Sequence, residues 1–528
     1  METINDLFQR LEQLNDIGAS LSNERNLNRL LEKILLAAKA ITHADGGTLY
    51  LLTEDRQHLH FEIVRTDSLN VAFGGTSDQP TSGKFPDLPL YKEDGSPNNS
   101  MVAAYAAITG ETVNIADAYT AEGFDFSGTR KFDERTGYRS QSFLTVPMKN
   151  HEGEIIGVLQ LINAISPREA NVVPFSLADQ RLAESLASQA AIALTNRQLV
   201  QQLENLFEAF IQLINLAIDE KSPYTGGHCQ RVPELTMMLA EAVNATTTGP
   251  LADFTLTDKD RYELRIAALL HDCGKVTTPV HVVDKATKLQ TIFDRIHLLD
   301  TRFEVLKRDA EIEALKAVAG GTDEGVVSAQ LAERIAQLEA DREFLRSANV
   351  GGERMSDDSI ERVKRIGSAY RWRNVQGEEV PFLTDNELEN LTIRAGTLTQ
   401  AEREIINYHI VATIKMLEQL PWPKHLKNVP EYAGGHHERM DGKGYPKGLK
   451  REQMSWQARM MGIADIFEAL TAKDRPYKDA MKLSQALAIM ENFKKNGHID
   501  PDLHEVFVSG EVFRKYANGF LANVQVDC

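Results

Sequence analysis

The chain has 528 residues, 42% of them hydrophobic and 25% charged, which is ordinary for a soluble globular protein of roughly two to four domains. Its formal net charge of -18 excludes broad, non-specific binding to nucleic acid, although a small anionic ligand still fits a local cationic pocket. Cys229, Cys273 and Cys528 offer neither a disulfide framework nor a CxxC zinc pattern, so we expect a reducing, cytoplasmic location. The first residues lack a secretory signal pattern, and no apolar run approaches the roughly 18 residues of a membrane span.

Residues 1–22 are predicted to form an amphipathic helix. Ile4, Leu7, Leu11, Leu14 and Leu21 follow the three- and four-residue spacing of one helical face. Such a stripe either pairs between chains or covers the helix's own domain, and the sequence leaves both interpretations open.

Residues 23–195 are predicted to form an α+β domain with an antiparallel sheet. Strand patterns occupy residues 48–52 and 59–63, and two apolar runs cover residues 142–148 and 155–162. The two runs are separated by the turn residues 150–153, which predict a hairpin.

This region resembles a GAF domain, a small-molecule sensor, and is close to the GAF domains of cyclic-nucleotide phosphodiesterases. The resemblance rests on residues 117–119, on 131–142 with the run to Val146 and Pro147, and on 157–163, which include part of an Asn-Lys-Phe-Asp-Glu signature. The signature residues present here are Lys131, Phe132, Asp133 and Glu134. In that family the lysine and aspartate brace the ligand pocket. The resemblance implies a cyclic nucleotide effector, and a ligand-free dimerisation domain is the alternative.

Residues 196–218 are predicted to form a helical stalk. Leu199, Leu203, Leu206, Phe210 and Leu213 form a seam with alternating spacings of four and three residues. This pattern favours a homodimer through the stalk over a helix that packs only on its own domain.

Residues 219–528 show almost no strand pattern and are predicted to form an all-α domain with a helical insertion at about 291–395. Apolar residues between 303 and 318 mark one helix, Gly320 and Gly321 break it, and apolar residues between 331 and 345 mark a second. We expect an α-hairpin here, followed by a less regular polar stretch.

The all-α domain carries the side chains that suit a metal centre for phosphoester hydrolysis. A lone histidine is more often a hydrogen-bonded or surface residue, and a buried aspartate in an apolar helix is relieved by a metal, a salt bridge or a cap. The hypothesis of a metal site therefore depends on the whole set, which is His228, His271, Asp272, His409, His436, His437 and Asp465.

At these positions the chain resembles the HD-GYP family, a branch of the HD metal-dependent phosphohydrolases. The motifs that carry the resemblance are residues 223–228, 271–275, 396–399 leading to His409, 436–449, 464–465 and 474–478. The resemblance implies hydrolysis of cyclic di-GMP to pGpG or onward to GMP. It also implies that the seven residues above bind a binuclear iron or manganese centre, with Asp272 bridging the two ions.

The same resemblance assigns substrate-binding roles. Lys275 follows Asp272 by three residues and would hold a phosphate oxygen or the attacking water, which makes Asp272 and Lys275 the catalytic candidates. Arg475 and Lys478 match the basic residues that grip the substrate phosphates. The loop at the mouth of the site would consist of Gly442, Gly444, Tyr445 and Pro446.

Two departures from the family pattern stand out. Some members carry a glutamate four residues before the first histidine that supports a third metal, and here that residue is Tyr224. We therefore expect two metals, which places complete conversion to GMP in doubt. The second departure is the insertion, which is a lid, a dimer contact or a partner surface.

Other functions stay open. The same site suits another cyclic dinucleotide such as cGAMP, and less well a cyclic mononucleotide or a nucleotide polyphosphate. A protein of a different class, a catalytically silent HD-GYP scaffold that signals through partners, is disfavoured by the intact set of ligands.

Overall fold

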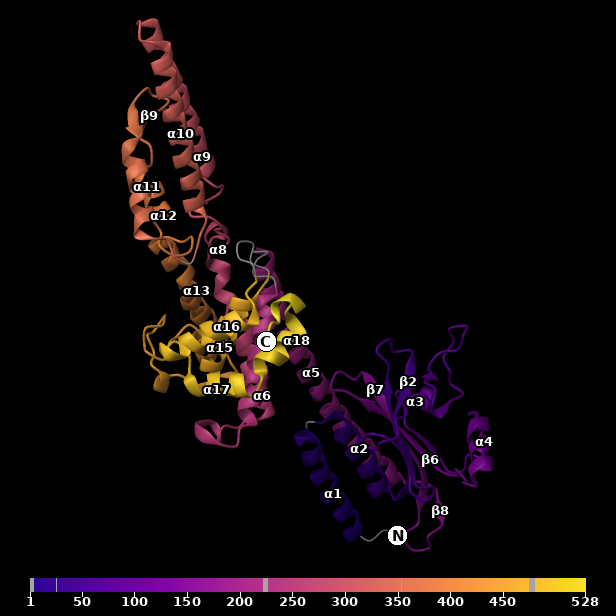
Figure 1. Ribbon diagram of the computed structural model, residues 1–528. Coiled ribbons are helices and arrows are strands. Elements are labelled where there is room, and N and C mark those ends of the chain that lie inside the picture. Colours follow the sequence, from indigo (N-terminus) through magenta and orange to yellow (C-terminus); the bar gives the residue numbers. More distant parts are fainter. Residues whose placement is uncertain (1–3, 25, 222–226, 353, 474–479) are drawn as a thin grey trace. The chain divides into compact units, whose positions relative to one another are not determined.

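The computed structural model describes residues 4–24, 26–221, 227–352, 354–473 and 480–528. The chain divides into two compact units, Met1–Phe207 and Glu208–Cys528. The first unit is α+β and the second is mostly helical, as the sequence predicts (Figure 1).

One antiparallel sheet forms the centre of the first unit. Its strand order is β3-β2-β1-β7-β6-β5, with β4 beside β2 and β8 beside β7. The predicted hairpin is confirmed, because β6 and β7 pair on either side of the turn. The elements of this unit are α1 (Ile4–Asn23), α2 (Leu27–Thr42), β1 (Ala44–Leu52), β2 (His58–Thr66), β3 (Val71–Gly74), β4 (Leu88–Pro89), α3 (Val102–Thr109), β5 (Val113–Ile115), α4 (Ser127–Thr136), β6 (Phe143–Lys149), β7 (Ile155–Ile165), β8 (Val172–Val173) and the start of α5 (Leu177–Lys221).

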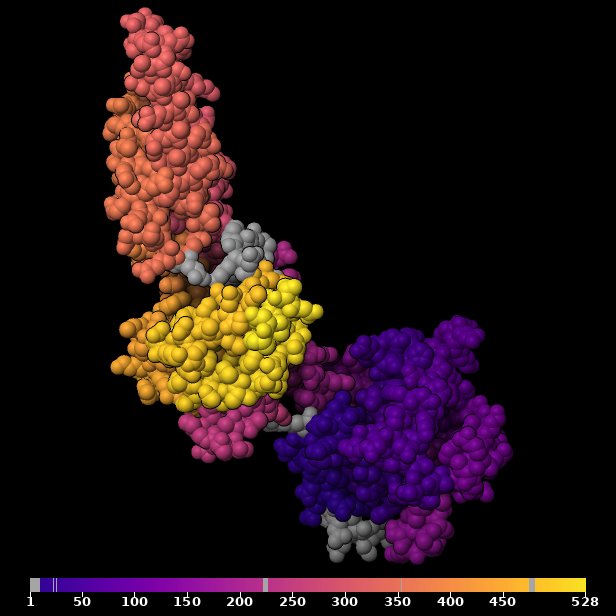
Figure 2. Space-filling model, in the orientation of Figure 1, coloured from indigo at the N-terminus to yellow at the C-terminus, as the bar shows by residue number. Residues whose placement is uncertain are grey.

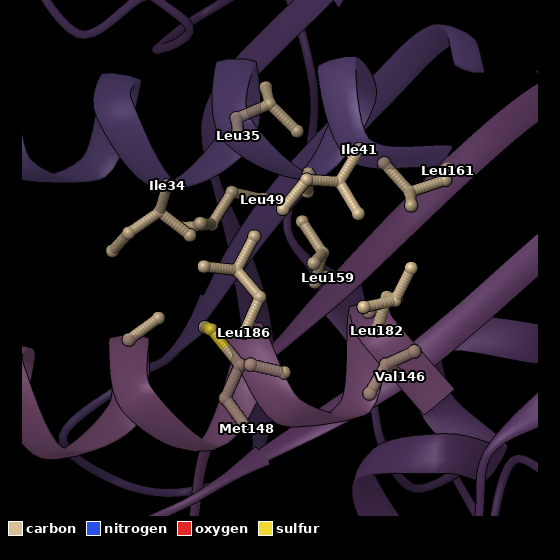
Figure 3. Packing of buried hydrophobic residues seen from close by; sticks show 14 of the residues in the cluster. Ile34, Leu35, Ile41, Leu49, Val146, Met148, Leu159, Leu161, Leu182 and Leu186 are labelled. Atoms are coloured by element: carbon tan, nitrogen blue, oxygen red, sulfur yellow. The ribbon is translucent and has the colours of Figure 1, made fainter. Parts of the chain in front are cut away.

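Apolar side chains from α1, α2, the sheet and α5 form the main core of this unit. Figure 3 shows Ile34 of α2, Leu49 and Leu159 of the sheet and Leu186 of α5 close together in this core. Burial of each such side chain contributes roughly 1.5–3 kcal/mol. Leu14 and Leu21 of α1 belong to the same core, so α1 covers its own domain.

Helix α5 is continuous from the first unit into the second. Its first turns are buried against the sheet, whereas the seam between Leu199 and Leu213 is 45% to 65% exposed. None of the described residues buries this apolar seam.

The second unit is built from helices, and the strands found among its described residues form one short hairpin, β9 and β10. Among the described residues, none of the helices has the length and apolar character needed to cross a bilayer. The elements are α6 (His228–Asn244), η1 (Gly249–Leu251), α7 (Asp258–Leu270), η2 (Cys273–Thr277), α8 (Val280–Val283), α9 (Ile296–Ala319), α10 (Glu324–Asn349), α11 (Asp357–Ala369), β9 (Arg371–Arg373), β10 (Glu379–Pro381), α12 (Asp385–Leu391), α13 (Gln400–Glu418), η3 (Lys424–Leu426), α14 (Val429–Gly434), η4 (Arg451–Gln453), α15 (Trp456–Thr471), α16 (Leu483–Lys495), α17 (Pro501–Ser509), α18 (Val512–Phe520) and η5 (Asn523–Gln525).

The predicted α-hairpin of the insertion is present as α9 and α10, which lie side by side (Figure 1). The stretch after it is more regular than the sequence predicts, because α11, β9, β10 and α12 pack back on the hairpin. Phe303, Leu338, Val363, Phe382 and Leu391 meet in a core of their own. The few apolar residues of α11 lie one helical turn apart among many polar residues, which hid the helix in the sequence. Figure 2 shows the side chains of the insertion, coloured from pink and salmon to orange, forming a continuous packed surface.

The insertion leaves and rejoins the rest of the unit at one place. Thr397 Oγ1 donates to the carbonyl oxygen of Lys285 at 2.8 Å, and Lys285 Nζ lies 2.7 Å from a carboxylate oxygen of Glu402. Glu402 also closes the capping box with Thr399 that begins α13. The two ends of the insertion are therefore held together at the start of the helix that carries His409.

Candidate metal centre

Five helical segments bring the seven predicted ligands together. His228 is the first residue of α6, His271 and Asp272 follow the end of α7, and His409 lies in α13. His436 and His437 follow α14, and Asp465 lies in α15.

The side chains gather into two neighbouring groups. The ligand atoms of His228, His271 and Asp272 lie within 4.8 Å of one another, as do those of His409, His436 and His437.

Asp272 lies between these groups. Its Oδ2 lies 3.2 Å from Nε2 of both His228 and His271, and its Oδ1 lies 3.3 Å from Nε2 of His409. One carboxylate thus presents an oxygen to each group, which is the geometry expected of a bridging ligand.

Asp465 spans the groups in the same way. Its Oδ1 lies 3.2 Å from His228 Nε2, and its Oδ2 lies 3.9 Å from His437 Nδ1. The resemblance implies a bridging role for Asp272 alone. Only the tertiary structure shows that Asp465 also lies between the two groups.

Two glycines allow the helices to approach this closely. A Cβ atom on Gly274 would lie 2.0 Å from the carbonyl oxygen of His409, and one on Gly462 would lie 2.9 Å from that of His436. Segment η2 therefore rests directly on α13, which places Asp272 beside His409.

Backbone carbonyls orient three of the imidazoles. The Nδ1 atoms of His271 and His436 lie 2.7 Å and 2.6 Å from the carbonyl oxygens of Ala268 and Ala433, and His409 makes the same contact with Ile406. An Nδ1–H that donates to a carbonyl leaves the Nε2 lone pair free to bind a cation. These three rings direct that lone pair into the cluster.

The electrostatics favour the metal-binding forms of His436, His437 and Asp272. Burial lowers the pKa of His436 well below its usual range, and it lowers the pKa of His437 to about 4. Burial alone would raise the pKa of Asp272, but Lys275 and His271 outweigh it and hold that pKa well below the usual range. Neutral imidazoles and an ionised carboxylate are the states that bind metal at neutral pH.

Buried histidine nitrogens that lack a hydrogen-bond partner also indicate that a metal ion fits this site. Among the described residues, no hydrogen-bond partner is found for the buried Nε2 atoms of His409 and His436. An unpartnered buried polar atom costs about 1–3 kcal/mol, and a bound cation removes that cost. The mixed imidazole and carboxylate donors suit divalent first-row metals.

Glu468 is a residue of the site that the sequence analysis missed. Its carboxylate is buried, contacts Nδ1 of His228 and accepts from Nε of Arg231 at 2.7 Å. Burial alone would lower the pKa of His228, but hydrogen bonds to Asp272, Asp465 and Glu468 outweigh it and raise that pKa well above its usual range. The available signal was its position one helical turn after Asp465 in an apolar helix.

Lys275 lies where the sequence predicts. Its Nζ is 2.6 Å from Asp272 Oδ2, and the contact is made across a 3-10 turn rather than a continued α-helix. Burial alone would lower the pKa of Lys275, but Asp272 and Asp465 raise it, so the ammonium is charged.

The loop with Gly442, Gly444, Tyr445 and Pro446 lies against the second histidine group. The Tyr445 ring stacks on His437 at 4.9 Å between ring centres, so one face of the tyrosine is already covered. Gly444 permits the fold of the loop, since a Cβ atom there would lie 2.4 Å from the amide nitrogen of Arg439. Arg475, Lys478 and Tyr224 lie outside the described residues.

In the first unit, the signature residue Asp133 is buried and is braced by neighbours other than Lys131. It accepts from Tyr119 Oη at 2.7 Å and from the amide nitrogen and hydroxyl of Ser140 at 2.8 Å. Among the described residues no ion pair joins Lys131 to Asp133, and Lys131, Phe132 and Glu134 are exposed.

Comparison with protein families assigns both units. A GAF domain matches residues 26–194, and an HD domain matches residues 225–348 and again residues 354–503. The chain combines a GAF domain with an HD domain. Within the HD domain, the first match contains His228, His271 and Asp272, and the second contains the other four members of the cluster.

Relatives that match part of the chain are phosphodiesterases by name. The chain is 40% identical over 111 residues to 3'3'-cGAMP-specific phosphodiesterase 3 of Vibrio cholerae, covering 21% of this chain and 23% of that protein. It is 37% identical over 115 residues to a cyclic di-GMP phosphodiesterase of Pseudomonas aeruginosa, covering 22% and 27%. The chain thus spans about a quarter of the length of these relatives. A solved GAF domain from an Acinetobacter phosphoenolpyruvate-protein phosphotransferase is matched over 37% of this chain and 98% of that one, at 19% identity and a TM-score of 0.27.

Proposed function

We propose that this protein is a metal-dependent phosphodiesterase that hydrolyses cyclic di-GMP to pGpG. The observation that supports it is the convergence of five imidazoles and two carboxylates into adjoining groups that both carboxylates span. Paired metal sites of this kind suit the cleavage of a phosphoester bond.

Each group has the donors to hold one metal ion. His228 and His271 would serve one ion and His409, His436 and His437 the other, while Asp272 and Asp465 each offer an oxygen to both. We propose iron or manganese, in line with the HD-GYP resemblance and with the nitrogen and oxygen donors. When bound, such metals lower the pKa of water and neutralise charge on the phosphoryl group.

The residues around the cluster have separate tasks in this proposal. Lys275 presents an ammonium at the rim of the metal site and would hold a phosphate oxygen. Glu468 fixes the ring of His228 through Nδ1, and the loop with Gly442, Gly444, Tyr445 and Pro446 shapes the entrance. Arg475 and Lys478 stay predicted contacts for the substrate phosphates.

The second candidate substrate is 3'3'-cGAMP, because two relatives are named for it and one for cyclic di-GMP. Both molecules are cyclic dinucleotides with two phosphodiester bonds, so the metal cluster does not distinguish them. The base-contacting residues would decide between the two.

The deciding experiment compares both substrates on protein of known metal content. Protein purified under reducing conditions is loaded with iron or manganese, analysed for metal, and incubated with each dinucleotide before chromatography of the products. We expect conversion of cyclic di-GMP to pGpG by the wild type and loss of both metal and turnover in Asp272→Ala. The exposed Asp253→Ala in the same unit should behave as the wild type.

A metallated wild type that leaves both dinucleotides intact would contradict the proposal and favour the silent scaffold. Loss of metal from Asp272→Ala without any turnover in the wild type would support a metal site but not this chemistry.

We further propose a homodimer through α5, with the GAF domain as a sensor for a cyclic nucleotide. The support is the exposed seam between Leu199 and Leu213, whose heptad spacing fits a parallel helix of a second copy. A GAF ligand would regulate hydrolysis if its affinity differed between two arrangements of this stalk. Sedimentation of the wild type tests the dimer, and the response of hydrolysis to cyclic AMP or cyclic GMP tests the sensor.

A further inference from the structure

The helical insertion contains a cavity of about 200 Å³. Its walls come from the segment before α9, the end of α10, the residues that lead into α11 and the residues after α12. Three of the lining residues are cations, Lys288, Arg354 and Arg394, and the described residues that line it include no acid. This concentration of positive charge is unusual on a chain with a net charge of -18.

Lys288 is the buried cation of the cavity. It is 2% exposed, and its Nζ donates to the carbonyl oxygen of Leu391 at 3.2 Å and lies 3.2 Å from the sulfur of Met355. A thioether is a weak acceptor, so the ammonium has one good partner for its three protons. Burial lowers the pKa of Lys288 to about 8, which still leaves it charged at neutral pH.

The other buried lysines among the described residues each have a carboxylate partner. Lys39 is paired with Asp67, Lys285 with Glu402, and Lys307 with Glu304. Lys285 is only three residues from Lys288 and has both a carboxylate and the amide of Asn390. Among the described residues, Lys288 has no carboxylate within ion-pairing distance. A buried charge without a counter-ion is costly, and a bound anion would supply one.

The two arginines add donors at the open side of the cavity. Arg354 is exposed, and Arg394 makes one contact of 2.6 Å with Asp357 in which both side chains are more than half exposed. An exposed ion pair contributes about 0–1 kcal/mol and is readily exchanged for a stronger acceptor. Guanidinium groups bind phosphate through paired hydrogen bonds.

The wall that carries Lys288 is fixed in place. The amide nitrogens of Lys288 and Leu289 donate to the carbonyl and side-chain oxygens of Asn349 at 2.9 Å and 2.8 Å. The rest of the lining includes the hydroxyl residues Ser347 and Ser359 and the apolar Phe344. The cavity thus has a buried cation at a defined position, polar donors around it and room for a compact ligand.

We propose that this cavity is a binding site for a small phosphorylated metabolite, with Lys288 as the central contact for the phosphate and Arg354 and Arg394 closing over it. The volume of about 200 Å³ is below the roughly 300–1,000 Å³ of sites for larger ligands, which favours a compact ligand over a cyclic dinucleotide. The site is separate from the metal cluster and does not depend on the proposed phosphodiesterase activity.

The test is a binding titration of the full-length protein with inorganic phosphate and with glycerol 3-phosphate, and succinate serves as a carboxylate probe. We expect Lys288→Met to weaken binding of the phosphates about tenfold or more, since a charge-assisted hydrogen bond in a buried setting is lost. Arg394→Gln, on the exposed rim, should weaken binding less and covers the case in which Lys288→Met does not fold. Lys364→Met, which removes an exposed cation of α11 outside the cavity, should bind as the wild type does.

Asp272→Ala separates this site from the metal cluster. Phosphate binding that survives in Asp272→Ala and falls in Lys288→Met and Arg394→Gln supports the proposal. Binding that disappears in Asp272→Ala, that is unchanged in both cavity variants, or that is absent at millimolar phosphate overturns it. Equal affinity for succinate would overturn the assignment to a phosphate ester.

Discussion

Glu468 offers the sharpest test of the metal centre, because it touches a proposed ligand without being one. Its carboxylate contacts Nδ1 of His228 and accepts from Arg231, and the side chain is 1% exposed. Glu468→Gln keeps the shape of the side chain but removes its charge. A neutral amide no longer holds the His228 ring with a carboxylate, so the ring becomes a weaker and less ordered ligand.

The size of the effect follows from this geometry. Loss of a carboxylate behind a metal-binding histidine lowers metal affinity about 10- to 100-fold, or roughly 1.4–2.7 kcal/mol. The variant also leaves Arg231 opposite a neutral group, which should lower the free energy of unfolding of the metal-free protein by about 1–3 kcal/mol. Competition with a chromophoric chelator measures the manganese affinity, and urea unfolding measures the stability.

Glu387→Gln is a matched control from the insertion. Glu387 is also buried and paired with an arginine, Arg302 at 2.7 Å, but among the described residues it contacts no imidazole. We expect the control to lose stability by a similar amount and to keep its metal affinity. Metal affinity within about twofold of the wild type in Glu468→Gln, or an equal fall in both variants, would refute the assigned role.

Three further predictions address other parts of the molecule. Because burial lowers the pKa of Lys288 from 10.5 to about 8, the unfolded chain binds more protons between these values, and this residue's contribution to stability rises with pH across that window. Lys288→Met should therefore raise the free energy of unfolding at pH 7 by up to about 3 kcal/mol and flatten its increase above pH 8. Gly274→Ala should lower stability by about 1–3 kcal/mol and weaken metal binding, because its Cβ atom would lie 2.0 Å from the carbonyl oxygen of His409. Leu203→Glu combined with Phe210→Glu, at seam positions that are 65% and 55% exposed, should convert a dimer to a monomer in sedimentation without lowering the stability of the single chain.

Each of these predictions has a clear contrary outcome. A Lys288→Met protein that is less stable than the wild type at pH 7 would show that the charge is already compensated. Gly519→Ala, where the added Cβ atom meets open space, is the control for Gly274→Ala, and equal effects would remove the packing argument. An unchanged sedimentation coefficient in the seam variant would place any dimer contact elsewhere.

Much of the architecture was predictable because it depends on local patterns. Alternating apolar residues predicted the strands of the GAF sheet, and helical spacing predicted α5, α9 and α10. The sequence did not show which of these elements pack against one another. The sequence left open whether helix α1 pairs between chains or packs on its own domain. Burial of Leu14 and Leu21 in the core beside the sheet shows that it packs on its own domain. Helix α11 was missed because its apolar face is narrow and its partners lie far away in the sequence.

The identities of the ligand candidates came from short motifs, but their relation in space came from the fold. Residues 228 to 465 approach one another only because α7, α13, α14 and α15 pack closely, with Gly274 and Gly462 at the contacts. A motif specifies donor types, whereas distances between segments hundreds of residues apart depend on packing. The position of Glu468 one helical turn after Asp465 was a local signal, but only the fold shows that Glu468 contacts His228 and that Asp465 spans both groups.

The amino-acid sequence by itself indicated that this chain joins a sheet domain of the sensor type to a helical domain rich in metal-binding side chains. Only the folded chain showed that the buried Lys285 is paired with a carboxylate and that Lys288, three residues away, has none among the described residues, because counter-ions for both must come from distant segments. Residue type and spacing report what a segment is able to do, and long-range packing determines which groups it meets.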